Sequence, residues 1–410
     1  MLHRVRKGAA PSALLADHLV TEECVSGSPL VMGNKVDLLS SGPETYDAML
    51  DAITQARRSV YLESYILESD SIGARFAAAL IDRSRAGVVV ALMVDAIGTL
   101  STADTYFDEL RKAGVHVVFF NPINPFGIHS EWSPNERNHR KVLITDSCVG
   151  FTGGFNLSEV YSSRPGRSGA KHRQVAFKHA PWRDTHIRIQ GPAALELQRE
   201  FLQGWKDQGG SPLPSASAFV GDVMREPAGD DVVRIITSSP ADVCGIYWTL
   251  ISAISKSQRS VHITMAYFVP DPTFLEALKD AARRGVDVTL VLPGFSDFWM
   301  VFHAGRSHYA ELLESNVRIF ERRDAFLHAK TAVIDGVWST VGSSNMDWRS
   351  FVHNHELNAV VLGHAFGQEM ENLFEKDCND SVRIQVAEWQ RRSWTFRLRE
   401  YVSLLFEYWL

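Results

Sequence analysis

Two segments of the chain carry the same polar residues at the same spacing. The first runs from His139 to Asn156 as HRKVLITDSCVGFTGGFN, and the second runs from His328 to Asn345 as HAKTAVIDGVWSTVGSSN. In each segment a lysine, an aspartate, a glycine and an asparagine follow the histidine by 2, 7, 14 and 17 residues. This repetition predicts one site built from two halves. Paired imidazoles, ammonium groups and amides suit chemistry on a phosphodiester.

Each segment is predicted to begin with a strand, because VLITD and TAVID are rich in β-branched residues. Side chains two residues apart share one face of a strand, so Lys141 and Lys330 are expected beside their histidines. The motif aspartates Asp146 and Asp335 stand at an odd interval. We therefore expect them on the opposite face, where they hold loops or form ion pairs.

The end of each motif is predicted to be a turn that returns Asn156 or Asn345 to the face of the histidine and lysine. Small residues in such a turn let backbone N–H groups approach an anion closely. The turn residues are Gly153 and Gly154 in the first copy, and Gly342 and Ser343 in the second.

The predicted mechanism is nucleophilic catalysis in two steps. One imidazole attacks phosphorus and forms a covalent phosphohistidine. The other protonates the leaving alcohol and then deprotonates the acceptor. A usual histidine pKa of about 6.5 makes both forms accessible near neutral pH. We assign His139 as the nucleophile and His328 as the acid and base. The lysines supply positive charge, so we expect no metal and no other cofactor.

A carboxylate follows each motif at a matching position. Asp184 lies in WRDTHIRIQG and Glu356 lies in HNHELNAVVLG, each seven residues before the final glycine of its segment. A nucleophilic histidine needs a partner that fixes its tautomer, so we expect each carboxylate beside the histidine of its own half. The alternative is an ordinary acidic residue at the start of a surface strand. The presence of a carboxylate at the same position in both halves argues against that alternative.

The duplication extends over most of the chain. AITQARRSV at 52–60 matches AISKSQRSV at 253–261, and RAGVVVALMVD at 85–95 matches RRGVDVTLVLP at 283–293. Helices that alternate with apolar strands predict an α/β fold of two tandem α-β-α sandwich domains, with the site at their interface. The expected divisions are an N-terminal arm at 1–35, a first domain at 36–208, a linker at 209–231, a second domain at 232–380 and a tail at 381–410.

Composition narrows the functional class. A chain of 410 residues that is 45% hydrophobic can bury two cores. Its four cysteines have no metal-ligand spacing, which indicates reduced thiols. A net charge of −6 argues against a general nucleic-acid binder. We find neither an apolar run of about 18 residues nor a signal peptide, and expect a soluble or peripheral protein.

Three other stretches bear on ligand binding. A basic loop after the first motif is either a lid that attracts anionic headgroups or a solvated loop. The apolar segment 293–309 either lines an entrance for acyl chains, with Trp299 and Arg306 as contacts, or starts a buried helix. The aromatic and arginine-rich tail is either a membrane-associating amphipathic helix or a helix docked on the second domain. The loop residues are Arg164, Arg167, Lys171, Arg173 and Lys178.

The segments RNHRK, FTGGFN, WRDTHIRIQGPA, FLHAKT and GSSNMDWRSF resemble bacterial cardiolipin synthases of the phospholipase D superfamily. That superfamily carries HxKxxxxD followed by GxxN, and Gly154 replaces its usual serine. The resemblance implies two phospholipase D-like domains that make cardiolipin from two phosphatidylglycerol molecules, or from phosphatidylglycerol and another phospholipid donor. The implied intermediate is a phosphatidyl-histidine that a lipid alcohol attacks. Together with the motif and the matched carboxylates, the resemblance leads us to expect as catalytic residues His139, Lys141, Asn156, Asp184, His328, Lys330, Asn345 and Glu356.

The resemblance also implies partners and a location. Anionic phospholipids, namely phosphatidylglycerol and cardiolipin, are the expected ligands, and no nucleic acid is expected. The chain looks like the shorter type of synthase without an N-terminal pair of transmembrane helices. We therefore expect a peripheral enzyme on the cytoplasmic face of the bacterial inner membrane. The alternatives are a hydrolytic phospholipase D, a metal-independent nuclease and a membrane-binding scaffold without catalysis. The oligomeric state stays open.

Overall fold

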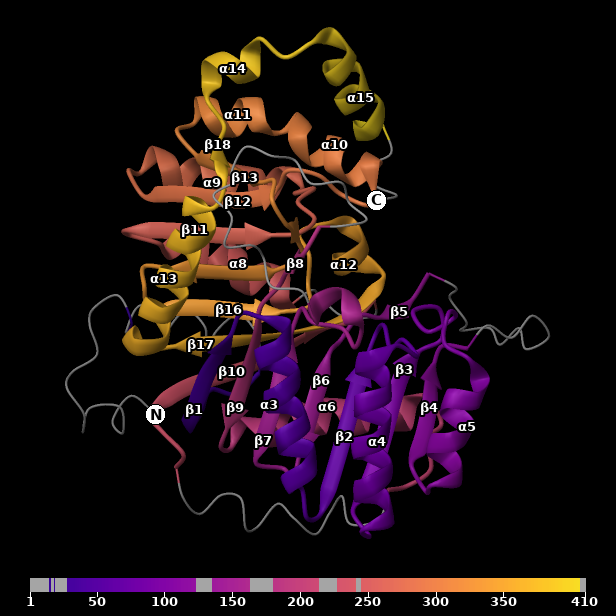
Figure 1. The fold of residues 1–410 in the computed structure, drawn as a ribbon. Helices are drawn as coiled ribbons and strands as arrows, with labels where there is room; N and C mark the ends of the chain where they lie inside the picture. Colours follow the sequence, from indigo (N-terminus) through magenta and orange to yellow (C-terminus); the bar gives the residue numbers. More distant parts are fainter. Residues whose placement is uncertain are drawn as a thin grey trace.

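The computed structural model describes Leu15, His18 and residues 28–122, 135–162, 180–213, 227–240 and 245–405. The first half is drawn in indigo to magenta in Figure 1. Its elements are β1 (Val31–Leu39), α3 (Gly42–Gln55), β2 (Ser59–Ser64), α4 (Ser71–Arg85), β3 (Val89–Asp95), α5 (Asp104–Lys112), β4 (His116–Phe120), β5 (Arg137–Asn138), β6 (Val142–Thr145), β7 (Val149–Gly153), β8 (Trp182–Arg183), β9 (His186–Gln190) and α6 (Ala193–Asp207).

The second half repeats this order and adds elements at its end. They are β10 (Asp231–Ser238), α8 (Gly245–Lys256), β11 (Ser260–Met265), α9 (Pro272–Arg283), β12 (Asp287–Pro293), α10 (Trp299–Ser307), α11 (Tyr309–Glu314), β13 (Arg318–Arg322), β14 (Phe326–Leu327), β15 (Lys330–Ile334), β16 (Trp338–Gly342), α12 (Trp348–Val352), β17 (Asn354–Leu362), α13 (His364–Asn379), β18 (Val382–Arg383), α14 (Val386–Gln390) and α15 (Trp394–Leu404).

Equivalent local signals start equivalent helices in the two halves. The Asp70 carboxylate accepts from the backbone N–H groups of the first turn of α4, and Asp271 does the same for α9. Such caps satisfy donors that the helix itself leaves unpaired. Each helix then returns the chain to a buried parallel strand, β3 or β12. The duplicated sequence thus folds into duplicated βαβ units.

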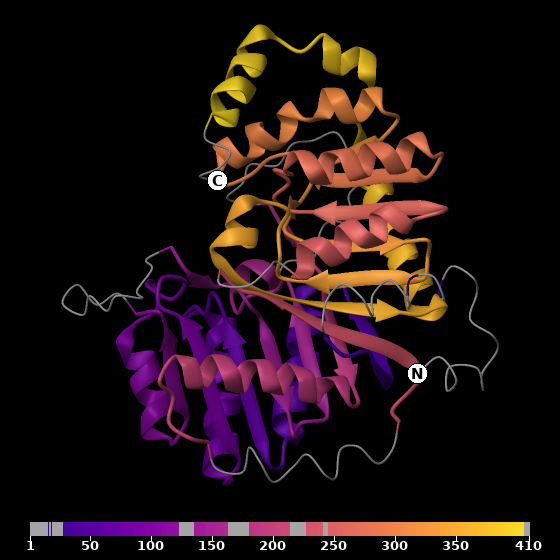
Figure 2. The same cartoon turned by 180° about the vertical axis from the view of Figure 1, so that it is seen from behind.

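Each half is an α-β-α sandwich, which confirms the predicted fold class. In the first half, α3, α4 and α5 cover one face of the sheet and α6 crosses the other (Figures 1 and 2). In the second half, α8 and α9 lie on one face and α13 on the other. These layers bury the apolar faces of the strands, which is the main stabilising contribution to the fold.

The two sheets are joined edge to edge. The strand order in the described chain is β18-β13-β12-β11-β15-β16-β17-β10-β1-β9-β7-β6-β2-β3-β4, and β5 pairs with β17. Strand β1 lies between β9 of the first half and β10 of the second. Beneath this junction one apolar core contains Ile187 and Phe201 together with Val333 and Leu357. The two halves are therefore packed as one body around their interface.

Several expected boundaries differ in the structure. Strand β1 begins at Val31, so the last residues of the expected N-terminal arm belong to the sheet. Farther upstream, the Nε2 atom of His18 lies 3.2 Å from Asp335 Oδ2, a contact with the second half. The expected tail also begins inside the domain, because β18 pairs with β13. Hydrogen bonds between backbone groups of paired strands fix these boundaries, and amino-acid composition does not reveal which strands pair.

None of the helices in the described ranges combines the length and apolar character needed to span a bilayer.

Candidate active site

Each motif histidine is reached by a short strand that pairs with the opposite half. Strand β5, just before His139, runs parallel to the start of β17. Strand β14, just before His328, runs parallel to β8. The backbone N–H of His139 donates to His355 O at 2.9 Å, and that of His328 donates to Arg183 O at 2.8 Å. Both histidines are thus held by backbone hydrogen bonds across the domain interface.

The carboxylates are exchanged between the halves. The Nδ1 atom of His139 lies 3.0 Å from both carboxylate oxygens of Glu356, and His328 Nδ1 lies 2.6 Å from Asp184 Oδ2. The expectation that each acid serves the histidine of its own half is therefore wrong. The reason is the crossing of β5 and β14, which brings each histidine to the acid-bearing strand of the other domain.

Burial governs the protonation of these pairs. It lowers the pKa of His139, and it lowers that of His328 to about 3, although the facing carboxylates oppose the effect. Burial acts to raise the pKa values of Asp184 and Glu356, but the facing histidines, the motif lysines and hydrogen bonds from Thr185 and Ser343 together lower both values below their usual range. A neutral imidazole that donates Nδ1–H to a carboxylate keeps the Nε2 lone pair available for attack.

Aromatic rings enclose the two imidazoles unequally. The ring of His139 contacts Tyr65, with a centroid distance of 5.2 Å. The side chains of His139 and His328 are 12% and 8% exposed, so both reach solvent only narrowly. Four rings surround His328 at centroid distances of 5.3–6.3 Å, namely Tyr161, Trp182, Tyr267 and Phe326.

The sequence interpretation missed these aromatic residues. Tyr65 directly follows strand β2, and Tyr267 follows the end of the equivalent strand β11 by two residues. Trp182 precedes Asp184 by two residues. Their recurrence beside the duplicated strands was the available signal.

The two motif lysines are buried cations beside the histidines. Lys141 Nζ donates to His139 O at 2.5 Å, and Lys330 Nζ lies 3.0 Å from His328 Nδ1. Burial lowers the pKa of Lys141 to about 7 and that of Lys330 to about 8, and the Lys330 ammonium group further lowers the pKa of Lys141. A bound anion would relieve both effects, because it stabilises the charged form of each lysine.

The two motif asparagines are buried and differ in their contacts. Asn156 Oδ1 accepts from Ile66 N at 3.2 Å, and its Nδ2 donates to Tyr161 Oη at 2.9 Å. Asn345 Oδ1 is buried and has no hydrogen-bond partner among the described residues. Asn345 and Lys330 line the same small cavity. In the second half, the motif lysine and asparagine therefore border one cavity.

The departure at Gly154 has a steric consequence. A Cβ atom at this position would come within 2.0 Å of Asp184 Oδ1. At the equivalent position of the second half, the Ser343 hydroxyl donates to Glu356 and accepts from Leu357 N. One carboxylate thus packs against a glycine, and the other is held by a serine hydroxyl.

The motif aspartates face away from the imidazoles and bind backbone. Asp146 accepts from the N–H groups of Arg57, Arg58 and Ser59 at 2.7–2.9 Å. Asp335 accepts from the equivalent groups at 258–260. These are the loop contacts expected from the odd spacing. Close approach is also required at Gly153 and Gly342, where a Cβ atom would collide with the neighbouring strand.

The remaining expected binding residues do not join this centre. Trp299 is 54% exposed on α10. Arg306 forms an ion pair with Glu321 at 2.5 Å and lies over the Trp389 ring, so its charge is used in the packing of the C-terminal elements. The basic loop residues, Arg164 to Lys178, lie outside the described residues.

The buried lysines predict pH-dependent anion binding. Sulfate, whose charge is constant between pH 6 and 9, should bind most tightly below pH 7. Its affinity should fall by about tenfold or more as the pH rises past the lowered pKa values of Lys141 and Lys330, because deprotonation removes the charges it contacts. Titration calorimetry measures this. Lys141→Arg, which stays charged, should flatten the profile. An affinity that is constant to pH 9 in the unsubstituted protein would contradict the assignment.

Comparison with known proteins places this geometry in a family. The family model described as "Cardiolipin synthase, PLD-like domain" matches residues 49–164 and 250–378, which contain the two histidine motifs. Cardiolipin synthase from Alkalihalophilus pseudofirmus is 34% identical over 380 residues, covering 92% of this chain and 73% of that protein. Cardiolipin synthase from Geobacillus thermodenitrificans is 35% identical over 379 residues, covering 92% and 72%.

A solved structure shares the fold at lower identity. Phosphatidylserine synthase from Haemophilus influenzae superposes with a TM-score of 0.69 at 13% identity, covering 96% of this chain and 100% of that one. The family model and the relatives agree. The chain belongs to the cardiolipin synthase family of phospholipase D-like proteins.

Proposed function

We propose that this protein is a phosphatidyltransferase that makes cardiolipin from phosphatidylglycerol. The observation that carries the proposal is the paired centre itself, in which two buried imidazoles each bind a carboxylate and lie beside a buried lysine. The relatives that are 34–35% identical over most of this chain are cardiolipin synthases. One phosphatidylglycerol serves as donor, and the hydroxyl group of a second lipid, itself phosphatidylglycerol, serves as acceptor.

The first step forms the covalent intermediate. Nε2 of one imidazole attacks phosphorus of the donor, so a P–N bond forms and the bond from phosphorus to the glycerol oxygen breaks. The negative charge of the bound phosphate opposes the effect of burial and favours the protonated form of the second imidazole. That imidazolium delivers its Nε2 proton to the glycerol oxygen, and glycerol leaves. Lys141 and Lys330 stabilise the charge that develops on the non-bridging oxygens. The amides of Asn156 and Asn345 are proposed to add hydrogen bonds to the same oxygens.

The second step transfers the lipid. The second imidazole, now neutral, takes the proton of the acceptor hydroxyl group, whose oxygen attacks phosphorus. The P–O bond of cardiolipin forms as the P–N bond breaks, which restores the free histidine. The four rings around His328 and the low exposure of both imidazoles support transfer over hydrolysis, because they restrict the access of water to the centre.

The proposed ligands also set the proposed location. Donor, acceptor and product are membrane lipids, so we propose that the protein works as a peripheral enzyme on the cytoplasmic face of the bacterial inner membrane. The C-terminal α14 and α15 support membrane association, because they combine exposed aromatic and leucine side chains with arginines.

Product analysis tests the reaction. Incubation with phosphatidylglycerol vesicles should yield cardiolipin and glycerol in equal amounts, measured by mass spectrometry and a glycerol assay. His139→Ala and His328→Ala should each lower the rate by at least about 10²-fold, because each removes a group that acts on a transferred bond or proton. His116→Ala on the edge strand β4 is the matched control and should leave the rate unchanged. Phosphatidic acid without cardiolipin would instead indicate a hydrolase.

The identity of the nucleophile is tested separately. We keep His139 as the predicted nucleophile and His328 as the acid and base. Brief incubation with labelled phosphatidylglycerol, followed by quenching under alkaline conditions and peptide mass mapping, should place the phosphoryl label on the peptide that contains His139. A label on the peptide with His328 would reverse the two roles and leave the chemistry otherwise unchanged.

A further inference from the structure

Exposed apolar side chains concentrate at one corner of the second domain. Among the described residues, nine of the fourteen large apolar side chains that are exposed lie at the start of α10 or on the segment from α14 to the end of α15. Such a concentration in a water-soluble domain marks an interaction surface. The nine are Phe298, Trp299, Val386, Trp394, Phe396, Leu398, Tyr401, Val402 and Leu405.

Helix α15 presents one continuous apolar stripe. Trp394, Leu398, Tyr401 and Leu405 follow each other at intervals of four, three and four residues, which places them on one face of a helix. They are 73%, 52%, 64% and 65% exposed. The helix lies along α10 at the edge of the molecule (Figures 1 and 2). We call this stripe, together with Phe298 and Trp299, the docking face.

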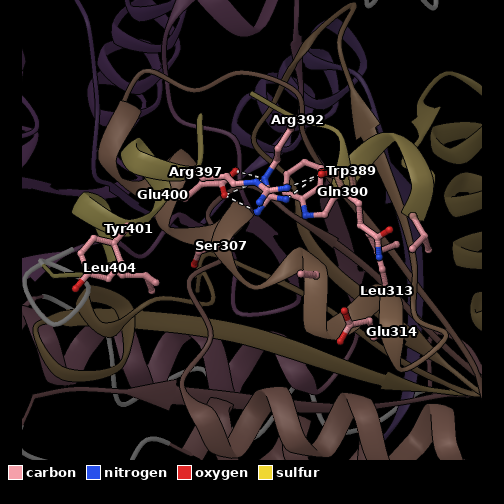
Figure 3. A pocket seen from close by; sticks show the side chains of 12 residues that line it. Ser307, Leu313, Glu314, Trp389, Gln390, Arg392, Arg397, Glu400, Tyr401 and Leu404 are labelled. Atoms are coloured by element: carbon pink, nitrogen blue, oxygen red, sulfur yellow. Dashed lines mark hydrogen bonds and ion pairs between the residues drawn. The ribbon is translucent and has the colours of Figure 1, made fainter. Parts of the chain in front are cut away.

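The opposite side of α15 attaches the helix through a polar contact. Glu400 is buried and binds the guanidinium group of Arg392, with a shortest distance of 2.8 Å (Figure 3). Arg392 in turn lies 4.4 Å from the centroid of the Trp389 ring. A cavity of about 380 Å³ lies beside this contact, lined by Leu313, Tyr401 and Leu404 among others. Of the stripe, Tyr401 borders this cavity, whereas Trp394, Leu398 and Leu405 do not line it.

The charge of this corner is opposite to that of the whole chain. Arg391, Arg397 and Arg399 are exposed on α15 or at the end of α14, and Arg399 lies over the Phe396 ring. The one acidic residue of α15, Glu400, is neutralised by Arg392 on the inner side. The chain as a whole carries a net charge of −6. A basic rim around exposed tryptophan, tyrosine and leucine side chains complements an anionic lipid surface.

The docking face reaches the catalytic centre through two ring contacts. Phe298, which is 61% exposed, lies 6.2 Å from Tyr267 between ring centroids. Tyr267 lies 6.3 Å from His328 and donates its hydroxyl to Asp297 at 2.8 Å. A lipid that leaves a bilayer at Phe298 therefore meets the wall of the histidine centre directly.

We propose that the docking face binds the surface of a bilayer that contains anionic phospholipid, and that Phe298 and Tyr267 mark the point where a lipid passes from the bilayer toward His328. The face binds through insertion of the apolar stripe and attraction of the arginine rim to headgroups. The role of the bound lipid as substrate rests on the proposed function. Bilayer binding itself is independent of turnover.

Vesicle co-sedimentation tests the proposal on the His139→Ala/His328→Ala protein, in which no product forms. This protein should bind vesicles of phosphatidylglycerol and phosphatidylcholine more tightly than vesicles of phosphatidylcholine alone. Trp394→Ser/Leu398→Ser/Leu405→Ser should lower the partition coefficient by about tenfold or more, because it removes three inserting side chains. The matched controls Trp248→Ser and Leu100→Ser, at exposed positions in other parts of the fold, should bind as before.

A second variant addresses the arginine rim and leaves the exposed apolar side chains unsubstituted. Arg397→Gln/Arg399→Gln should lose most of the preference for vesicles that contain phosphatidylglycerol. Its vesicle binding should resemble that of the protein with both arginines measured at high salt, where their charges are screened. Circular dichroism confirms that each variant is folded. Unchanged binding of both variants would overturn the proposal. A second outcome would also overturn it: light scattering shows a dimer of the protein without the stripe substitutions, and the stripe variant is a monomer that binds vesicles as before. The face would then join two copies of the chain.

Discussion

The interaction on which the rest of the structure depends is the exchange of carboxylates between the two halves. Glu356 holds the imidazole of His139 and Asp184 holds that of His328, so neither half contains a complete catalytic pair. The short strands β5 and β14 make this exchange possible by pairing with the opposite half. The shared core and the continuous sheet keep the two domains in the register that these bonds require.

The same interface creates the electrostatic conditions for phosphoryl chemistry. Burial lowers the pKa values of both histidines and both lysines, and the facing carboxylates compensate only in part. A centre that holds unfavourable positive charge in the free state gains most when an anion enters it. We therefore propose that substrate phosphate binds where the protein alone stabilises cations poorly, beside the aromatic rings that surround His328. The docking face at α15 extends this arrangement to the bilayer from which the lipid comes.

Much of the fold and the centre followed from the sequence because both are duplicated. Repeated strands and helices predicted two sandwiches. The even spacing from His139 placed Lys141 on the face of the histidine, and the odd spacing placed Asp146 on the opposite face. The partner of each histidine was predicted wrongly, because spacing along one half contains no information on which strand crosses to the other. The start of β1 was missed for a related reason, since only pairing with β9 and β10 identifies it as part of the sheet. The sequence likewise did not predict which side of α15 is exposed, because that depends on the packing of the helix against α10.

The crossed pairing is tested most directly by nuclear magnetic resonance of ring nitrogens in protein labelled at histidine with ¹⁵N. Signals of His139 and His328 are assigned by loss in His139→Ala and His328→Ala. Glu356→Gln should shift the Nδ1 signal of His139 and leave that of His328 nearly unchanged, and Asp184→Asn should do the reverse. If Glu356→Gln instead shifts His328, each carboxylate serves its own half and the crossed arrangement is contradicted.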